Sequence, residues 1–200
     1  CIDCKHIWHE RTTTLSAFTL CLLDSGFNLL FNFRIRFIQL SQKNKKIKMF
    51  NVRVYGLLLN GNNEVLVSDE LIKGNYYTKF CGGGLELGEG TIDCLKREFM
   101  EEMNLKVDII EHLYTTDFYQ TSAFNPNHQI ISIYYEVKPL HDILVPIKQK
   151  PFDFDEDQIK KHELTGQTES FRLVKWEEFS EELLSFPIDK IAARVFKKKK

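Results

Sequence analysis

The chain has 200 residues, a net charge of −1 and 43% hydrophobic residues, which is enough apolar material for one globular domain with a core. Residues 1–48 hold eight Lys or Arg against three Asp or Glu, a net charge of +5, so the remainder carries −6. Proteins that bind a nucleic-acid backbone need clustered Lys and Arg. The acidic part therefore argues against a nucleic-acid backbone as its main partner, whereas small nucleotides remain possible because metal ions can neutralise their phosphates.

Residues 1–48 differ in composition from the rest. The chain begins with Cys, the first Met is Met49, and residues 27–48 are rich in Phe, Asn, Ile and Lys, which AT-rich codons produce. We favour in-frame translation upstream of a start at Met49, so that residues 1–48 are a non-native or disordered extension and residues 49–200 the functional domain. A genuine peripheral extension is the alternative. A membrane segment is disfavoured because the apolar run Leu15–Leu23 has nine residues, whereas a span needs about 20.

The cysteines indicate a reducing compartment. Two of the five, Cys81 and Cys94, fall on a strand-like run and on a predicted helix. Buried reduced thiols are the expected state there, which favours a cytoplasmic location. The remaining cysteines lie in the first 48 residues, where the spacing Cys1-x2-Cys4-x-His6-x2-His9 is too compressed for a usual zinc finger.

Strands are the first elements predicted after Met49. Phe50–Leu59 is rich in β-forming residues, Asn60-Gly61-Asn62-Asn63 carries turn signals, and Glu64–Ser68 returns to a strand pattern. Together they predict a β-hairpin. Tyr77–Cys81 is a short predicted strand that leads into three consecutive glycines, Gly82 to Gly84, which let the backbone turn sharply and come close to a ligand.

Residues 91–103 have the periodicity of an amphipathic helix. Ile92, Leu95 and Phe99 recur at steps of three and four residues, which places them on one apolar face. Thr91 follows Gly90 and is the predicted N-cap, because its hydroxyl can accept from a free N–H of the first turn.

Three carboxylates cluster on this helix. Glu98, Glu101 and Glu102 stand at i, i+3 and i+4, so we expect all three to point the same way. Like charges at this spacing cost about 0.2–0.5 kcal/mol per pair, and the adjoining Arg97 cannot neutralise three of them. One interpretation of the cluster is a solvated acidic face without a function. The other is a site for a hard divalent cation such as Mg²⁺, which suits attack by water on a phosphate ester or anhydride.

The spacing of the whole segment favours the functional interpretation. Gly83, five residues, Glu89, seven residues and Arg97-Glu98-Phe99-Met100-Glu101-Glu102 resembles the signature of the Nudix hydrolase family, G-x5-E-x7-R-E-U-x-E-E-x-G-U, where U is a bulky aliphatic residue. Six of the seven fixed letters are present. At usages near 7% per residue type, a chance match comes to roughly 10⁻⁷ per start position. The match is specific for the family but not for the substrate.

The resemblance implies roles for individual residues. It assigns Glu98, Glu102 and the backbone carbonyl of Gly82 as direct metal ligands, and Glu101 as a ligand directly or through water. Glu89 and Arg97 are expected to hold the loop and the helix together and to orient the ligands. Mg²⁺ is the implied cofactor, with Mn²⁺ as a possible substitute.

The seventh fixed letter, a late glycine, is Asn104 in this chain. The signature glycine ends the helix, where a positive φ is expected, and Asn is the residue that tolerates this conformation next best. We therefore expect the turn and the activity to survive.

The rest of the chain predicts further strands and two helical segments. The strand-like segments are Leu105–Tyr119, His128–Val137 and Phe171–Trp176. A short helix is expected near 155–164. A closing helix is expected over Ser180–Ser185 and Ile188–Phe196, with a break at Pro187. This order resembles the Nudix α/β/α sandwich around a mixed sheet, over residues 49–196. The predicted fold class is therefore α/β.

Two connections bear on the substrate. The first connection is 120–127, and the aromatic residues in it or just before it are Phe118, Tyr119 and Phe124. Their rings could stack on a base, although packing in the core or a turn explains them equally well. The long polar connection 141–168 is a candidate lid. The resemblance to the family implies a general base beyond the signature, for which the candidates are, in order, Glu169, Glu163, Glu156 and Glu136. Glu101 is the candidate if the base lies within the signature.

These observations predict a magnesium-dependent hydrolase that cleaves the diphosphate linkage of a nucleoside diphosphate joined to another group. A nucleoside triphosphate, ribo or deoxy, or an ADP-ribose-like nucleotide is the favoured substrate. The alternative from another class is a Nudix-fold module that senses a nucleotide without cutting it. We expect no membrane partner, and a homodimer is possible.

Overall fold

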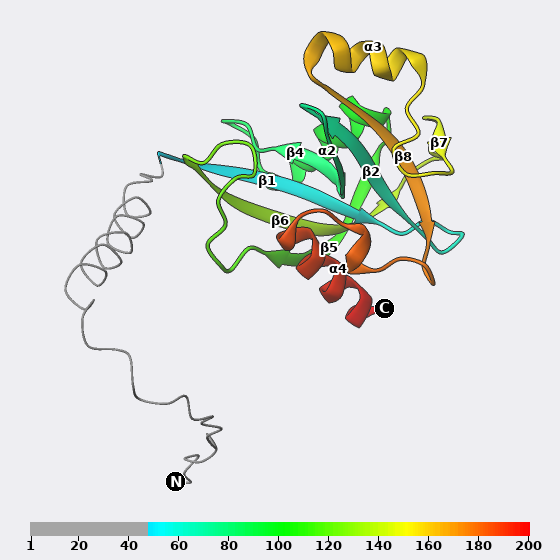
Figure 1. Ribbon diagram of the computed structural model, residues 1–200. Helices are drawn as coiled ribbons and strands as arrows, with labels where there is room; N and C mark the ends of the chain where they lie inside the picture. Colours follow the sequence, from blue (N-terminus) through cyan, green and yellow to red (C-terminus); the bar gives the residue numbers. More distant parts are fainter. Residues whose placement is uncertain (1–47) are drawn as a thin grey trace, which may run out of the picture. The chain divides into compact units, whose positions relative to one another are not determined.

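The computed structural model describes residues 48–200 (Figure 1). The predictions about residues 1–48 therefore concern a segment that lies, apart from Lys48, outside the described residues. Within the described part, eight strands form two four-stranded sheets, with the orders β4-β1-β6-β5 and β3-β2-β8-β7. Each sheet contains both parallel and antiparallel pairs, so each is mixed.

The first sheet is built on the strand that follows Met49. β1 pairs in parallel with β6 and antiparallel with β4, and β5 pairs antiparallel with β6. The bounds are β1 (Met49–Leu58), β4 (Cys81–Gly84), β5 (Val107–Thr115) and β6 (His128–Pro139). The pairing of β1 with β4 brings the glycine-rich segment against the strand that begins the domain.

The second sheet is centred on β2 and β8, which pair antiparallel along their length. A two-residue turn joins β2 to β3, and both of its residues, Lys73 and Gly74, have positive φ, as a type I′ turn requires. The bounds are β2 (Glu64–Ile72), β3 (Asn75–Lys79), β7 (Ile147–Lys148) and β8 (Gln167–Lys175).

The hairpin predicted at Asn60–Asn63 is wrong, although the turn itself exists. Asn60 organises the turn, because its side-chain oxygen accepts from the backbone N–H groups of Asn62 and Glu64. Beyond a single bridge between Leu59 and Val65, however, β1 and β2 diverge into different sheets. Turn residues fix the local reversal of the chain, but partners elsewhere in the sequence decide which strands pair.

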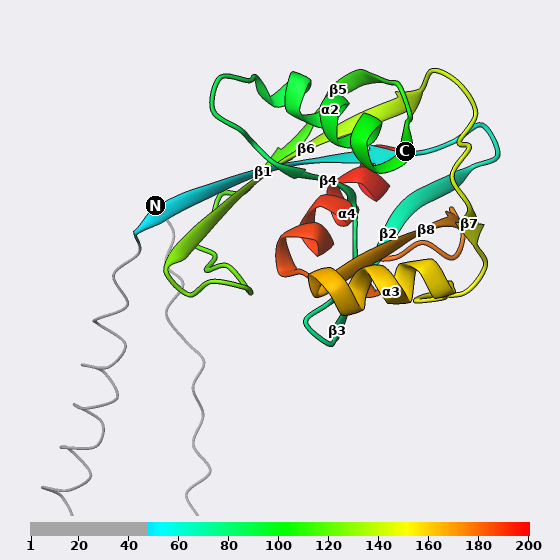
Figure 2. The ribbon, with the colours of Figure 1, turned by 90° about the horizontal axis from the view of Figure 1, so that it is seen from above.

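Two helices cover opposite faces of the strands. α2 (Thr91–Met103) packs on the face that carries Val54, and α4 (Pro187–Lys199) on the face that carries Tyr55. Neighbouring residues of a strand point to opposite faces, so β1 contributes to both halves of the core. Figure 2 shows α2 and α4 on opposite sides of β1, with α3 (Glu156–Thr165) alongside β8.

The helix ends follow local chemistry, with one exception. α3 has a capping box in which Asp155 and Gln158 bond each other's backbone N–H, and α4 begins at Pro187 after the short 3-10 helix η1 (Glu181–Leu183). The predicted N-cap of α2 is wrong: Gly90 is the N-cap, and Thr91 lies within the helix. The Thr91 hydroxyl is instead 2.7 Å from the hydroxyl of Tyr135.

The α/β class with mixed sheets and covering helices is thus confirmed, with the strands divided into two sheets. Across residues 48–200, no helix combines the length and the apolar character that crossing a membrane would need.

Candidate active site

A cavity of about 530 Å³ is lined by strands of both sheets, by α2 and by the start of α4. Its walls carry three kinds of side chain. The acids are Glu70, Glu98, Glu102, Glu169 and Asp189; the cations are Arg53, Lys73, Lys79 and Lys161; the aromatic rings are Tyr55, Phe124, Tyr134 and Phe186. Acids and cations together suit a ligand that brings both negative phosphates and metal ions.

The glycine segment is shaped by close approach. A Cβ on Gly82 would lie 2.2 Å from the carbonyl oxygen of Val54, and the φ of Gly82 is +133°. A Cβ on Gly83 would lie 2.3 Å from the carboxylate of Glu98. Only glycine therefore lets β4 run against β1 while leaving room for the Glu98 side chain.

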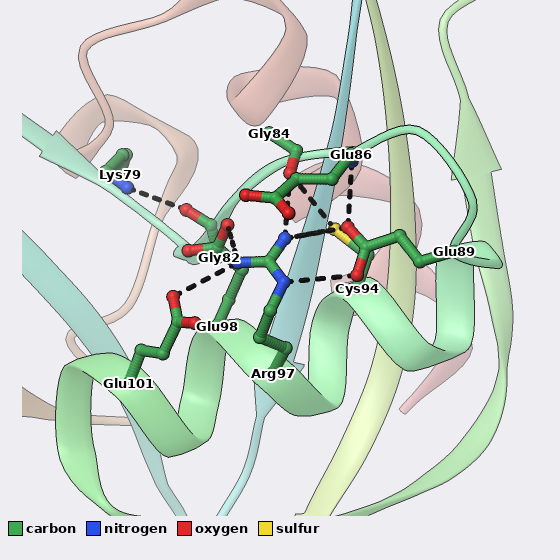
Figure 3. Close-up of polar contacts among 9 residues, drawn as sticks. All are labelled: Lys79, Gly82, Gly84, Glu86, Glu89, Cys94, Arg97, Glu98 and Glu101. Carbon is green, nitrogen blue, oxygen red and sulfur yellow. Dashed lines mark hydrogen bonds and ion pairs between the residues drawn. The ribbon is translucent and has the colours of Figure 1, made fainter.

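Arg97 joins the glycine loop to α2, as Figure 3 shows. Its guanidinium donates to both carboxylate oxygens of Glu89, at 2.7 and 3.1 Å, and to the carbonyl oxygen of Gly84 at 3.1 Å. Hydrogen bonds from Arg97 and from the backbone of Glu86 lower the pKa of Glu89 to about 2. Glu89 is thus held as a carboxylate that anchors the loop.

The three clustered carboxylates do not share one environment. Glu98 and Glu102 line the cavity, since a separation of four residues keeps them on one side of α2. Glu101 does not line it: its side chain is 61% exposed and bonds the guanidinium of Arg97 at 3.1 Å. Glu101 nevertheless lies beside Glu98, because Arg97 Nη1 donates to both carboxylates, so Glu101 is the more exposed member of the same cluster.

The oxygen atoms here nevertheless fit a hard cation. Glu102 Oε2 is buried and has no hydrogen-bond partner. Burial raises the pKa of Glu102, the charges of Glu169 and Glu98 raise it further, and Lys79 opposes them. A divalent cation would relieve this carboxylate, and carboxylate and carbonyl oxygens are the ligands that Mg²⁺ takes. Within residues 48–200, no group of three His, Cys, Asp or Glu side chains lies in an arrangement that could hold a metal ion.

Of the four candidate bases beyond the signature, the structure places one in the cavity. Glu169 lines it, faces the ammonium of Lys161 at 3.8 Å and has its pKa raised, chiefly by burial. Glu163 and Glu156 are exposed on α3 and do not line the cavity. Glu136 is buried elsewhere and pairs with Lys200 at 2.5 Å.

The three aromatic candidates are also separated. Phe124 lines the cavity, with its ring edge-on to Phe186 at 6.1 Å between centroids. Phe118 and Tyr119 are 37% and 60% exposed and lie outside the lining. Phe124 is thus the one of the three that a ligand in the cavity can contact.

Sequence reasoning missed two cationic side chains of the cavity, the buried Lys79 and the half-buried Arg53. Lys79 lies at the end of β3, with its side chain 5% exposed and its ammonium 3.0 Å from Glu70 Oε1. Arg53, on β1, donates to the hydroxyl of Tyr55 at 2.6 Å. For Arg53 the signal was a charged residue among the apolar residues Val52, Val54 and Tyr55; Lys79 ends a strand of mostly polar and aromatic residues, which gave no such signal.

Asp189 was missed for another reason. It stands in the first turn of α4, where an acid is ordinarily explained by the helix dipole. In the structure it is buried; the hydroxyl of Tyr134 donates to its Oδ1 at 2.5 Å, while its Oδ2 has no partner. Burial raises the pKa of Asp189 to about 6.

Comparison with known proteins now decides the family, because the family model described as NUDIX domain matches residues 49–196. The chain belongs to the Nudix family. Its fold is similar to that of a NUDIX hydrolase from Nitrosomonas europaea, with a TM-score of 0.54 and 16% identity over 75% of this chain and 90% of that chain. The MUTT protein from Methanosarcina mazei Go1 has a TM-score of 0.52 and 14% identity, over 76% of this chain and 97% of that chain.

Family membership assigns the general reaction. Nudix hydrolases cleave pyrophosphate bonds and generally use divalent metals, and this chain retains the signature carboxylates Glu98, Glu101 and Glu102. The protein is accordingly a pyrophosphohydrolase of this family.

Proposed function

We propose that this Nudix enzyme is magnesium-dependent and cleaves the diphosphate linkage of a nucleoside diphosphate joined to another group. A nucleoside triphosphate, ribo or deoxy, and an ADP-ribose-like nucleotide are the favoured substrates, and Mn²⁺ is a possible substitute for Mg²⁺. The observation that carries the proposal is the cavity, whose lining includes the carboxylates of Glu98, Glu102 and Glu169 together with aromatic rings and cationic side chains.

Glu98, Glu102 and the carbonyl oxygen of Gly82 would hold the metal, and Glu101 would act from its exposed position through water. Gly82, Glu98 and Glu102 all line the cavity, and the buried Oε2 of Glu102 is free to accept a ligand bond. When bound, Mg²⁺ supplies a polarised phosphoryl oxygen and an activated water.

Glu169 is the proposed general base. It lies on the cavity wall, and burial raises its pKa, which makes the carboxylate a better proton acceptor for the attacking water. Arg53 and Lys161 line the same cavity and would offset negative charge on the phosphates as the bond to the leaving group breaks.

The aromatic wall would hold the nucleoside. Phe124 and Phe186 offer ring surface for stacking on a base. The unpaired Oδ2 of Asp189 can accept a hydrogen bond from an N–H group of that base. A cytoplasmic location accords with the free, buried thiols of Cys81 and Cys94, since that compartment keeps thiols reduced.

The test is incubation of the full chain with Mg²⁺ and a panel of nucleoside triphosphates, oxidised nucleotides, ADP-ribose, nucleotide sugars and dinucleoside polyphosphates, with products identified by mass. We expect selective cleavage of one class, and loss of it in Glu102→Gln. Tight binding of a nucleotide without cleavage, by a folded protein with Mg²⁺ present, would instead establish the sensing module.

A further inference from the structure

The atoms proposed to bind the metal are already bonded to cationic side chains. Lys79 donates from Nζ to the carbonyl oxygen of Gly82 at 3.0 Å (Figure 3), and Arg97 donates to Glu98 Oε1 at 3.0 Å. Glu102 Oε2, in contrast, has no partner. Arg97 also holds the loop, but Lys79 comes from outside the signature and bonds the one backbone ligand of the site.

Lys79 is held firmly as an ammonium. Its Nζ is 3.0 Å from Glu70 Oε1 and 5.5 Å from the ring centre of Tyr55. A lysine whose side chain is 5% exposed is uncommon in a protein interior unless its charge is paired, and here that charge lies beside a carbonyl expected to bind metal.

We propose that Lys79 is a resident cation of the metal site, and that a divalent ion binds the Gly82 carbonyl only by displacing the Lys79 ammonium. This inference rests on the proposed metal site and adds a regulation of it. Like charges repel at close range inside a protein, and a divalent ion doubles the repulsion that a monovalent ion would exert on the ammonium. Simultaneous contact of the ammonium and the ion with the Gly82 carbonyl is therefore unfavourable.

Displacement has a consequence for the order of binding. The four-carbon stem of Lys79 is flexible, and an anionic phosphate in the cavity gives its ammonium another partner. Substrate therefore removes the competitor, and the divalent ion binds more tightly when substrate is present. By linkage, the metal strengthens substrate binding by the same factor.

The structure offers a charge-matched test. Lys79→Met removes one positive charge, Glu70→Gln removes one negative charge, and the double variant has the same net charge as the wild type. Mn²⁺ affinity is measured by calorimetry on the full chain without substrate. We expect Lys79→Met to bind Mn²⁺ at least about tenfold more tightly than the wild type. Glu70→Gln should bind Mn²⁺ no more tightly than the wild type. The double variant should still bind it about tenfold more tightly than the wild type.

Two results would overturn the proposal. One is a double variant that binds Mn²⁺ no more tightly than wild type, since the gain in Lys79→Met would then be general electrostatics. The other is equal tightening in Lys161→Gln, because Lys161 lines the cavity but has no bond to Gly82. The double variant also carries the test if Lys79→Met fails to fold, because it removes both partners of the Lys79–Glu70 ion pair.

The proposed function can fail separately. If the wild type and all variants are folded, bind no Mn²⁺ at millimolar concentration and cleave nothing in the substrate panel, the metal site and this inference both fall. If the wild type cleaves and binds Mn²⁺ but the charge-matched double variant gains no affinity, the role of Lys79 alone is overturned.

Discussion

The two walls of the cavity are built in different ways. On the wall made by residues 83–104, the contacts are local: Arg97 bonds Glu89, eight residues away, and Gly84, thirteen residues away. The opposite wall depends on long-range pairing: Tyr134 bonds Asp189 across 55 residues, and Glu70 stands opposite Glu169 in the pairing of β2 with β8. The local wall offers metal ligands, and the distant wall sets the charge and shape around them.

This difference teaches which residues tolerate change. A ligand on the local wall is held by the glycine loop and by Arg97, so removing it alters chemistry more than folding. A charge on the distant wall is buried between strands and the start of α4, so altering it affects stability as well. Comparing variants on the two walls tests whether the division is real.

The largest effect is expected on the local wall, from Glu102→Gln. The substitution removes a carboxylate that lines the cavity while keeping its size, so turnover should fall at least about 100-fold, equivalent to about 2.7 kcal/mol of barrier, with the fold intact. Steady-state kinetics with saturating Mg²⁺ measures the loss, and circular dichroism checks the fold.

Glu101→Gln is the matched control for that prediction. It makes the same chemical change one position earlier on α2, where the side chain is 61% exposed and does not line the cavity. We expect a loss of turnover below about tenfold. Equal losses in the two variants would show that Glu101 contributes as much as Glu102 and that the separation of the two side chains has no functional meaning.

The next effect concerns the distant wall and depends on pH. Burial raises the pKa of Asp189 from its ordinary value of 3.8 to about 6, so the folded protein binds this proton more tightly than the unfolded chain does. The resulting stability is full below about pH 4 and is lost as the pH rises through 6. At about 1.4 kcal/mol per pKa unit, the loss is on the order of 2–3 kcal/mol.

Asp189→Asn isolates this contribution, because the amide keeps an oxygen to accept from Tyr134 but cannot ionise. Urea unfolding of both proteins at pH 4 and pH 7.5 is the measurement. Between pH 4 and pH 7.5, the free energy of unfolding of the variant, relative to that of the wild type, should rise by on the order of 2–3 kcal/mol. A difference that stays constant with pH would mean that Asp189 does not titrate in this range.

A smaller effect on stability is expected from Arg97→Lys on the local wall. Lysine keeps the charge but cannot reproduce the guanidinium bonds to Glu89 and Gly84, so the free energy of unfolding should fall by about 1–2 kcal/mol. Arg194→Lys is the control, since Arg194 is half-exposed and bonds Glu181 alone. Its change should stay within about 0.5 kcal/mol, and the same loss in both variants would argue against a special role for Arg97.

Sequence patterns predicted the elements better than their partners. The apolar repeat of Ile92, Leu95 and Phe99 placed α2 correctly, since the helix ends at Met103 and Leu95 and Phe99 are buried, although Ile92 is 43% exposed. The turn at Asn60–Asn63 predicted a hairpin, but β1 pairs with β4 and β6 instead. Pairing depends on strands far along the chain, and local turn residues carry no information about them.

The candidate site shows the same limit. The spacing of Glu98 and Glu102 predicted correctly that they share one side of the helix. It could not show that Glu101 is the more exposed of the carboxylates that Arg97 bonds, because side-chain positions depend on rotamers as well as spacing. Lys79 and Asp189 reach the cavity through sheet pairing and through the docking of α4, so no motif marked them.

The smallest effect belongs to the one departure from the signature. Asn104 adopts the left-handed conformation, with φ 49° and ψ 38°, and its N–H donates to the carbonyl oxygen of Met100 at 2.9 Å. The turn that a glycine would form is therefore already present, so Asn104→Gly should change the free energy of unfolding by no more than about 0.5 kcal/mol and leave turnover unaltered. Asn104→Val is the contrast, because a β-branched residue in this conformation should cost at least about 1–2 kcal/mol. Both are measured by urea unfolding, and a large loss of turnover in Asn104→Gly would show that the amide side chain, rather than the turn, serves the site.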